Sequence, residues 1–195
     1  MIGQALKFLL DTVFGLLTYA FLLRFAMQWL RAPFRNPVGQ ALTALTDWAV
    51  KPLRRVLPGY RGLDWPTLLL AWLAQFLWLL CVTLLLGGSA IGSTIGGAVV
   101  ATLALFAAVE LLKSALWLLI VVVFIQAILS WVAPGGPIAG LLNVLTYRFL
   151  APIRRLVPPI GGTLDLSALI VIVLAQLALM LPVQWLEALV AGAIR

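Results

Sequence analysis

The sequence predicts an all-α membrane protein with about four transmembrane helices, arranged as two parallel repeats of span, amphipathic helix and span. Three observations lead to this fold class: an apolar composition, four long apolar runs and a duplicated motif. Of the 195 residues, 64% are hydrophobic and only 10% are charged, whereas soluble domains average about 45–50% and about 25%. A globular protein of this length could not bury such a surplus, so the chain requires lipid as its solvent.

Four stretches are long and apolar enough to cross a bilayer, which takes about 20 mostly apolar helical residues. Pro182 is expected to kink the last of them. Before the third span, residues 98–113 either prolong its helix or form a short hairpin. The four expected spans cover approximately residues 8–30, 65–86, 114–132 and 167–188.

Much of the chain is one unit present twice. The segment KPLRRVLP at 51–58 recurs as APIRRLVP at 151–158, and Trp29 and Trp131 each end the first span of a copy. Because each copy contains an even number of spans, both enter the membrane in the same direction, related by an axis along the membrane normal. We therefore expect two repeat units, residues 1–90 and 91–195.

The doubled motif is similar to that of a known family. In each copy a span ending in Trp is followed by Asn-Pro or Gly-Pro, then by Pro-[Leu/Ile]-Arg-Arg and a further proline, and finally by a glycine shortly before Leu-Asp. This pattern resembles the YggT family of small bacterial and plastid integral membrane proteins, and the resemblance covers about residues 8–181. It implies a multi-pass protein of the bacterial inner (plasma) membrane.

The resemblance also implies what kind of activity to look for. Bacterial members are linked to osmotic stress and potassium homeostasis, and cyanobacterial and plastid relatives to division or nucleoid distribution. One plastid branch is linked to haem attachment on a cytochrome. That last association is not expected to transfer, because this chain has no histidine and its only cysteine, Cys81, lies within a span.

Basic residues lie in the segments that precede the second and fourth spans, and the linker before the third span has none ahead of Lys113. The positive-inside rule therefore places both basic segments in the cytoplasm and both termini on the opposite side. The basic residues are Arg31, Arg35, Lys51, Arg54, Arg55 and Arg61 in the first segment, and Arg148, Arg154 and Arg155 in the second.

Two segments, 37–58 and 137–158, are amphipathic and too short to span the bilayer. Asn36 can cap the first helix, and Pro37 suits its first turn. Prolines 52 and 152 are expected to end the helical parts. Each segment is either a connector lying on the membrane surface or a helix docked against the bundle, forming a pocket or platform on the cytoplasmic side.

The Arg-Arg pairs within these segments are candidate binding residues for anionic lipid headgroups. Alternatively they bind one specific anion, a lipid phosphate or an acidic partner, because arginine makes bidentate contacts. Asp64 and Asp165, just before spans two and four, are candidate helix N-caps or ion-pair partners of the second arginine of each pair. The four arginines are Arg54, Arg55, Arg154 and Arg155.

Few polar residues lie inside the spans. Arg24, near the cytoplasmic end of the first span, is expected either to snorkel toward the interface or to make a polar contact inside the membrane. Gln75, Gln126 and Gln176 are expected to make polar contacts between helices. We expect Gln75 and Gln176 to face protein, and two neighbouring tryptophans, Trp72 and Trp78, to lie nearer the lipid.

The composition argues against chemistry of the chain's own. It has no histidine, no close carboxylate pair and no phosphate-binding glycine loop, so we expect no enzyme, no cofactor and no metal. The net charge of +7 resides in short loops between spans, which favours lipid contact over nucleic acid. One hypothesis is a non-enzymatic scaffold or assembly factor that binds membrane partners or a second copy; the other is a small transporter or channel subunit.

Overall fold

The computed structural model describes residues 2–60, 62–86, 97–133, 135–157 and 165–192, and within these ranges the chain is almost entirely helical. Two shorter helices are amphipathic, α2 (Pro37–Val56) and α6 (Pro137–Leu156). Four helical stretches are long and apolar enough to cross a membrane, which confirms the predicted fold class. They are α1 (Ile2–Trp29), α3 (Trp65–Leu86), α5 (Gly97–Val132) and the run of α7 (Leu166–Ala178), the π-helical turn η1 (Leu179–Val183) and α8 (Gln184–Gly192).

Residues 98–113 were expected either to prolong the helix of the third span or to form a short hairpin, and they prolong the helix. They belong to α5, whose 36 residues span about 54 Å at the rise of an α-helix. The expected boundary between the repeats, at residues 90 and 91, and the glycine of the second Gly-x-Leu-Asp motif lie outside the described residues.

The disturbance expected at Pro182 takes the form of the π-helical turn η1. Proline lacks an amide N–H, and its ring collides with the carbonyl four residues earlier. A wider turn moves that carbonyl aside and lets the helical run continue from α7 into α8.

The prediction that Pro52 and Pro152 end the amphipathic helices is wrong, since α2 and α6 each continue for one more turn. A proline in a helix leaves the carbonyl four residues earlier without its partner. Here those carbonyls belong to Trp48 and Arg148, which are both exposed. Water or lipid headgroups can solvate the freed carbonyl there, so the cost of helical proline is reduced.

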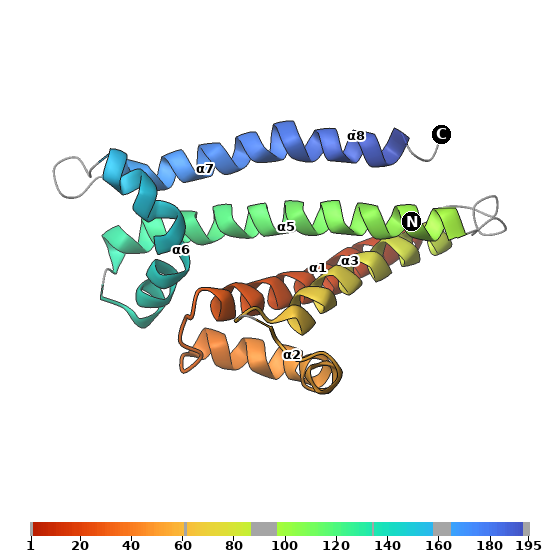
Figure 1. The fold of residues 1–195 in the computed structure, drawn as a ribbon, viewed down its shortest axis with the longest axis horizontal. Coiled ribbons are helices and arrows are strands. Elements are labelled where there is room, and N and C mark those ends of the chain that lie inside the picture. Colours follow the sequence, from red (N-terminus) through yellow and green to blue (C-terminus); the bar gives the residue numbers. More distant parts are fainter. Residues whose placement is uncertain (1, 61, 87–96, 134, 158–164, 193–195) are drawn as a thin grey trace.

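The helices are arranged as a parallel duplication. In Figure 1, α1 and α5 run in one direction, and α3 and α7 run in the other. The start of α1 and the end of α8 lie toward one end of the bundle, and α6 lies toward the opposite end. This is the arrangement that an even number of spans per repeat requires.

Three apolar clusters hold the helices together. Two are equivalent in the repeats: α1, α2 and α3 meet around Val50, and α5, α6 and α7 meet around Leu150. The third joins the repeats, since Met27 of α1 and Leu42 of α2 pack with Leu145 of α6. The amphipathic helices are therefore docked against the bundle, which was one of the two alternatives.

Candidate functional site

The first arginine of each Arg-Arg pair forms an ion pair with the aspartate that precedes the next span. Arg54 Nη2 lies 2.5 Å from Asp64 Oδ2, and its Nε donates to Oδ1 at 3.2 Å. Arg154 Nη2 lies 2.5 Å from Asp165 Oδ2, and its Nε donates to the same oxygen at 2.9 Å. We call these two ion pairs the junction locks, because each one holds an amphipathic helix to the start of the following span.

From the sequence, Arg55 and Arg155 were candidate ion-pair partners of the two aspartates. That prediction is wrong, because the first arginine of each pair makes the contact. Arg54 and Arg154 lie one helical turn after Val50 and Leu150, which are fully buried. Residues four apart share one face of a helix, so the first arginine of each pair lies on the packed side. The second arginine lies about 100° further round the helix.

The two aspartates also serve the helices that follow them. Asp165 Oδ1 accepts a hydrogen bond of 3.0 Å from the Ser167 amide and another from the Ser167 hydroxyl, so this residue is a helix cap and an ion-pair partner at once. Asp64 accepts from the Thr67 hydroxyl, and its side chain is 1% exposed. Burial raises the pKa of Asp165, but hydrogen bonds from Ser167 and Arg154 outweigh it, so the pKa lies below its ordinary value.

Arg55 and Arg155 are exposed and make no ion pair with any residue that the structure describes. Each lies in the last turn of its helix, where the helix dipole favours a cation. The residues that follow them, Val56 and Leu156, are 76% and 83% exposed. Each repeat therefore presents an arginine beside a large apolar side chain on its surface.

Of the two alternatives for Arg24, the structure shows a polar contact with another helix and not snorkelling. The residue is 4% exposed, and its Nη1 donates to Thr46 Oγ1 at 2.5 Å and Asp47 Oδ1 at 2.8 Å. Both acceptors lie on α2, which docks over the end of α1 and so supplies partners below the surface. A hydrogen bond from Lys51, opposed by partial burial and aided by Arg24, lowers the pKa of Asp47.

The glutamines in the spans differ from one another. Gln75 donates from α3 to Ser114 Oγ of α5 at 3.0 Å. Gln126 is 8% exposed and faces Gly140 and Asn143 of α6. Gln176 is exposed on the outer face of α7, so the expectation that it faces protein is wrong.

The two tryptophans expected on the lipid side both have partners in the bundle. Trp72 Nε1 donates to the carbonyl of Ala104 at 3.1 Å, and Trp78 Nε1 donates to Asp11 Oδ1 at 2.7 Å. An indole N–H in hydrocarbon needs an acceptor, and helices α5 and α1 supply it. The helix pattern alone did not reveal these acceptors.

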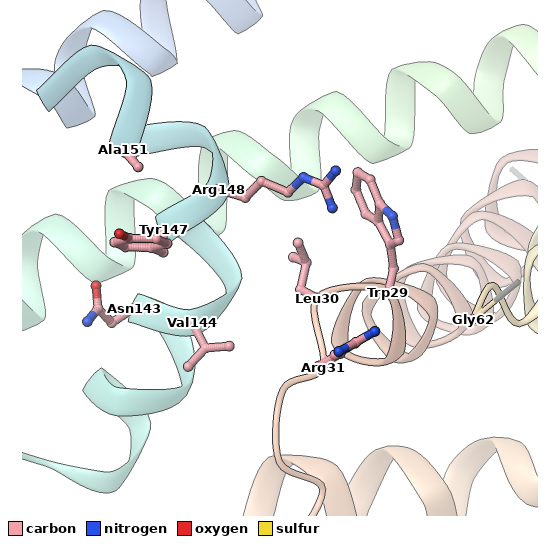
Figure 2. A pocket seen from close by; sticks show the side chains of 9 residues that line it. All are labelled: Trp29, Leu30, Arg31, Gly62, Asn143, Val144, Tyr147, Arg148 and Ala151. Atoms are coloured by element: carbon pink, nitrogen blue, oxygen red, sulfur yellow. The ribbon is translucent and has the colours of Figure 1, made fainter. Parts of the chain in front are cut away.

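An open cavity of about 860 Å³ lies between the end of α1 and α6, as expected if a docked amphipathic helix forms a pocket, although sequence reasoning did not identify its lining residues. We call it the vestibule; Trp29, Arg31, Asn143, Tyr147 and Arg148 are among its lining residues (Figure 2). The Arg148 guanidinium carbon lies 4.9 Å from the centre of the Trp29 ring. This cation–π contact bridges the repeats, and no spacing in either repeat indicates it.

A second cavity, about 420 Å³ in volume, lies between α1, α5 and α6. We call it the groove, and every side chain that lines it is apolar. Trp29 and Leu30 line both the groove and the vestibule. The two cavities are therefore adjacent, and these two residues belong to the walls of both.

Three charged side chains gather on α5 and α8. Lys113 Nζ lies 3.2 Å from Glu110 Oε1 and 2.8 Å from Glu187 Oε1. Leu166 begins α7, and Glu187 lies 21 positions further along the same helical run, or about 30 Å at the helical rise. Glu187 is thus near the far end of the fourth span, whereas Glu110 and Lys113 lie near the middle of α5. Among the described ranges, no group of three or more acidic, cysteine or histidine side chains could hold a metal.

Comparison with known proteins agrees with the duplication. A family model described as CCB3/YggT matches residues 3–85 and again residues 105–186. A relative in Vibrio alginolyticus, named only as an uncharacterized protein in the proC 3′ region, is 36% identical over 90% of this chain and 91% of its own length. Uncharacterized protein YggT of Escherichia coli K12 is 36% identical over 88% of this chain and 85% of its own. No solved structure matches.

Proposed function

The chain belongs to the CCB3/YggT family, and we propose that it is a non-enzymatic membrane scaffold or assembly factor that acts through the ends of α2 and α6. The observation that carries the proposal is the duplicated arrangement at these ends. In each repeat a junction lock fixes the last turn, and an exposed arginine and an exposed apolar residue project from it. We call the two exposed pairs, Arg55–Val56 and Arg155–Leu156, the presenting turns.

The junction locks give the presenting turns a defined geometry. Arg54 and Arg154 donate to their aspartates within the protein's own junctions, and the adjacent arginines keep their donors available for a partner. A surface fixed before binding loses less conformational entropy when a partner docks. Free guanidinium groups beside apolar side chains suit an acidic membrane partner or anionic headgroups in the inner leaflet.

The polar side chains of the spans support this reading over transport. Arg24 is neutralised against α2, and Gln75 is paired with Ser114. The cluster of Lys113 with two glutamates favours the alternative, a small transporter or channel subunit linked to osmotic stress or potassium. Glu110 and Lys113 lie near the middle of α5, but Lys113 is paired with both glutamates, and a membrane ion path requires further polar groups through the apolar centre.

Site-specific photo-crosslinking in native bacterial inner membranes tests the proposal. A photoreactive residue in place of Leu156 should give a discrete protein adduct, and the same residue in place of Leu169, which is exposed on α7, should give lipid adducts. The double variant Arg55→Gln and Arg155→Gln should abolish the protein adduct while leaving the fold intact, because neither arginine packs inside. An adduct of equal yield in the double variant argues against the presenting turns.

Potassium flux in proteoliposomes is the complementary measurement. We expect no flux above that of empty vesicles. Flux that Glu187→Gln abolishes would replace the scaffold proposal with the transport alternative.

A further inference from the structure

The vestibule and the groove differ in chemistry but are adjacent, because Trp29 and Leu30 line both. The vestibule carries two arginines, a tyrosine and an asparagine, and no acidic residue lines it. The groove is lined by apolar side chains from three spans, α1, α3 and α5, and from α6. Both volumes, about 860 and 420 Å³, fall in or near the range of ligand pockets, about 300–1,000 Å³.

The two arginines of the vestibule have unused hydrogen-bonding capacity. Arg148 stacks on Trp29 through the face of its guanidinium, which leaves the N–H groups at its edge directed away from the ring. Neither Arg148 nor Arg31 donates a side-chain hydrogen bond or forms an ion pair within the described part of the chain. Planar guanidinium edges of this kind bind phosphate oxygens in a bidentate manner.

Arg31 occupies its position at a conformational cost. Its φ is 55°. Helix α1 ends with two backbone hydrogen bonds, from the Arg31 amide to the Gln28 carbonyl and from the Ala32 amide to the Met27 carbonyl. This is a Schellman ending, whose left-handed residue is usually glycine. An arginine there costs about 1–2 kcal/mol more than glycine, and strained residues of this kind concentrate at binding sites.

We propose that the vestibule and groove together hold one anionic phospholipid, with its phosphate on Arg31 and Arg148 and an acyl chain between α1 and α5. The groove runs between helices that cross the membrane, so its occupant must be apolar and must come from the bilayer. The vestibule at the basic end of the same helices selects a negative headgroup. Trp29, shared by both spaces, marks the boundary between headgroup and hydrocarbon, where tryptophan is favoured.

This site is separate from the presenting turns, and it does not depend on the scaffold function. Its residues come from both repeats: Trp29 and Arg31 from the first, Tyr147 and Arg148 from the second. A lipid held there would act as a bridge between the repeats. Loss of the lipid therefore affects how the repeats pack, and loss of Arg55 and Arg155 does not.

Native mass spectrometry of the purified full chain tests the proposal. With phosphatidylglycerol added, we expect one lipid that remains bound under activation, and with phosphatidylcholine we expect none. Glycerol phosphate alone should also fail to bind, because it lacks the acyl chain. Equal retention of the neutral lipid, or a dimer in place of the lipid adduct, would overturn the proposal.

The decisive variant is Arg31→Gly combined with Arg148→Gln. Glycine suits the left-handed position, so the end of α1 should form at least as well as in the unchanged protein. The affinity for phosphatidylglycerol should fall by at least roughly tenfold, since two charge-assisted contacts are lost. The matched control is Lys7→Gln with Arg35→Gln, which removes the same charge at two exposed residues that line neither cavity and should retain the lipid.

A third variant tests the acyl chain alone. Ala115→Phe adds a ring to the wall of the groove and should reduce phosphatidylglycerol retention without changing any charge. A thermal unfolding curve of the lipid-free protein separates a blocked groove from a damaged fold. Unchanged affinity in the folded Ala115→Phe protein would overturn the assignment of the groove.

Discussion

The two repeats share their junction locks but differ where the amphipathic helix meets the first span. In the first repeat Arg24 pairs with Asp47, which also pairs with Lys51 at 2.8 Å. The corresponding positions in the second repeat hold Gln126, Tyr147 and Ala151. The shared junction locks are structural. Of the diverged residues, Tyr147 and Ala151 line the vestibule, and Gln126 lines a smaller cavity beside α6.

Another pair of equivalent positions shows the same division. Thr46 and Thr146 are fully buried in both repeats, and each hydroxyl bonds to the carbonyl four residues earlier. Two positions later, Trp48 of the first repeat is exposed on α2, while Arg148 of the second lies over Trp29 in the vestibule. The packed face of the amphipathic helix is therefore kept, and the outer face has been put to different uses.

The buried charge of the first repeat should give the largest effect on stability. Asp47→Ala leaves the Arg24 guanidinium buried with only Thr46 as an acceptor, and we expect it to lower the free energy of unfolding by about 3–5 kcal/mol. Unfolding in mixed micelles with increasing denaturing detergent measures this. Lys51→Ala, which removes an exposed partner, should cost less than about 1 kcal/mol.

Replacing the three charged residues of the first repeat with their equivalents from the second tests the same comparison. The triple change Arg24→Gln, Asp47→Tyr and Lys51→Ala removes the buried charge together with its partners. We expect it to recover more than half of the stability that Asp47→Ala loses, because a buried ion pair is often replaceable as a unit. A triple variant as unstable as Asp47→Ala would mean that the repeats are not interchangeable at this junction.

The junction locks should differ in strength although their residues match. Asp64 is 1% exposed and Asp165 is 24% exposed, so removing the arginine leaves a more deeply buried carboxylate in the first repeat. We expect Arg54→Gln to cost about 3 kcal/mol and Arg154→Gln about 1 kcal/mol. The same detergent titration compares them, and equal costs would contradict the role given to burial.

Equivalent residues could be recognised in the sequence, but the contacts between repeats could not. Apolar runs locate the four spans, and the recurrence of Pro-Leu-Arg-Arg and Pro-Ile-Arg-Arg reveals the duplication. Those patterns depend on local geometry, which the chain itself determines. The prediction that Arg24 snorkels failed because its hydrogen-bond acceptors lie 22 and 23 residues away on α2. No local sequence pattern indicates that α2 docks there.

The candidate site was predictable only in part for the same reason. The arginine and aspartate of each junction lock could be picked out, yet the choice between adjacent arginines depended on which face of the helix packs. The vestibule brings Trp29 to Arg148, 119 positions apart, and its existence follows from how two repeats meet. Whether the basic segments face the cytoplasm stays a prediction.

The span glutamines offer a smaller and more selective comparison. Gln75→Leu removes the hydrogen bond to Ser114 between α3 and α5 and should cost about 0.6–2 kcal/mol, as measured for such bonds in membranes. Gln176→Leu, on the outer face of α7, should leave stability unchanged or raise it. Thermal unfolding in detergent of both variants is the measurement, and equal losses would place Gln176 against a partner helix.

The smallest effect should appear on acidification, in both repeats together. The pKa of Asp47 and of Asp165 lies below the ordinary value of 3.8 in the folded protein. Each aspartate therefore binds fewer protons when folded, so its contribution to stability is complete well above that value and is lost as the pH falls below it. The unfolding midpoint should be flat from about pH 7 to about pH 5 and should decline below about pH 4. The triple variant, which lacks Asp47, should decline less steeply than the unchanged protein. A decline that begins above about pH 5 would instead require a carboxyl group whose pKa folding raises.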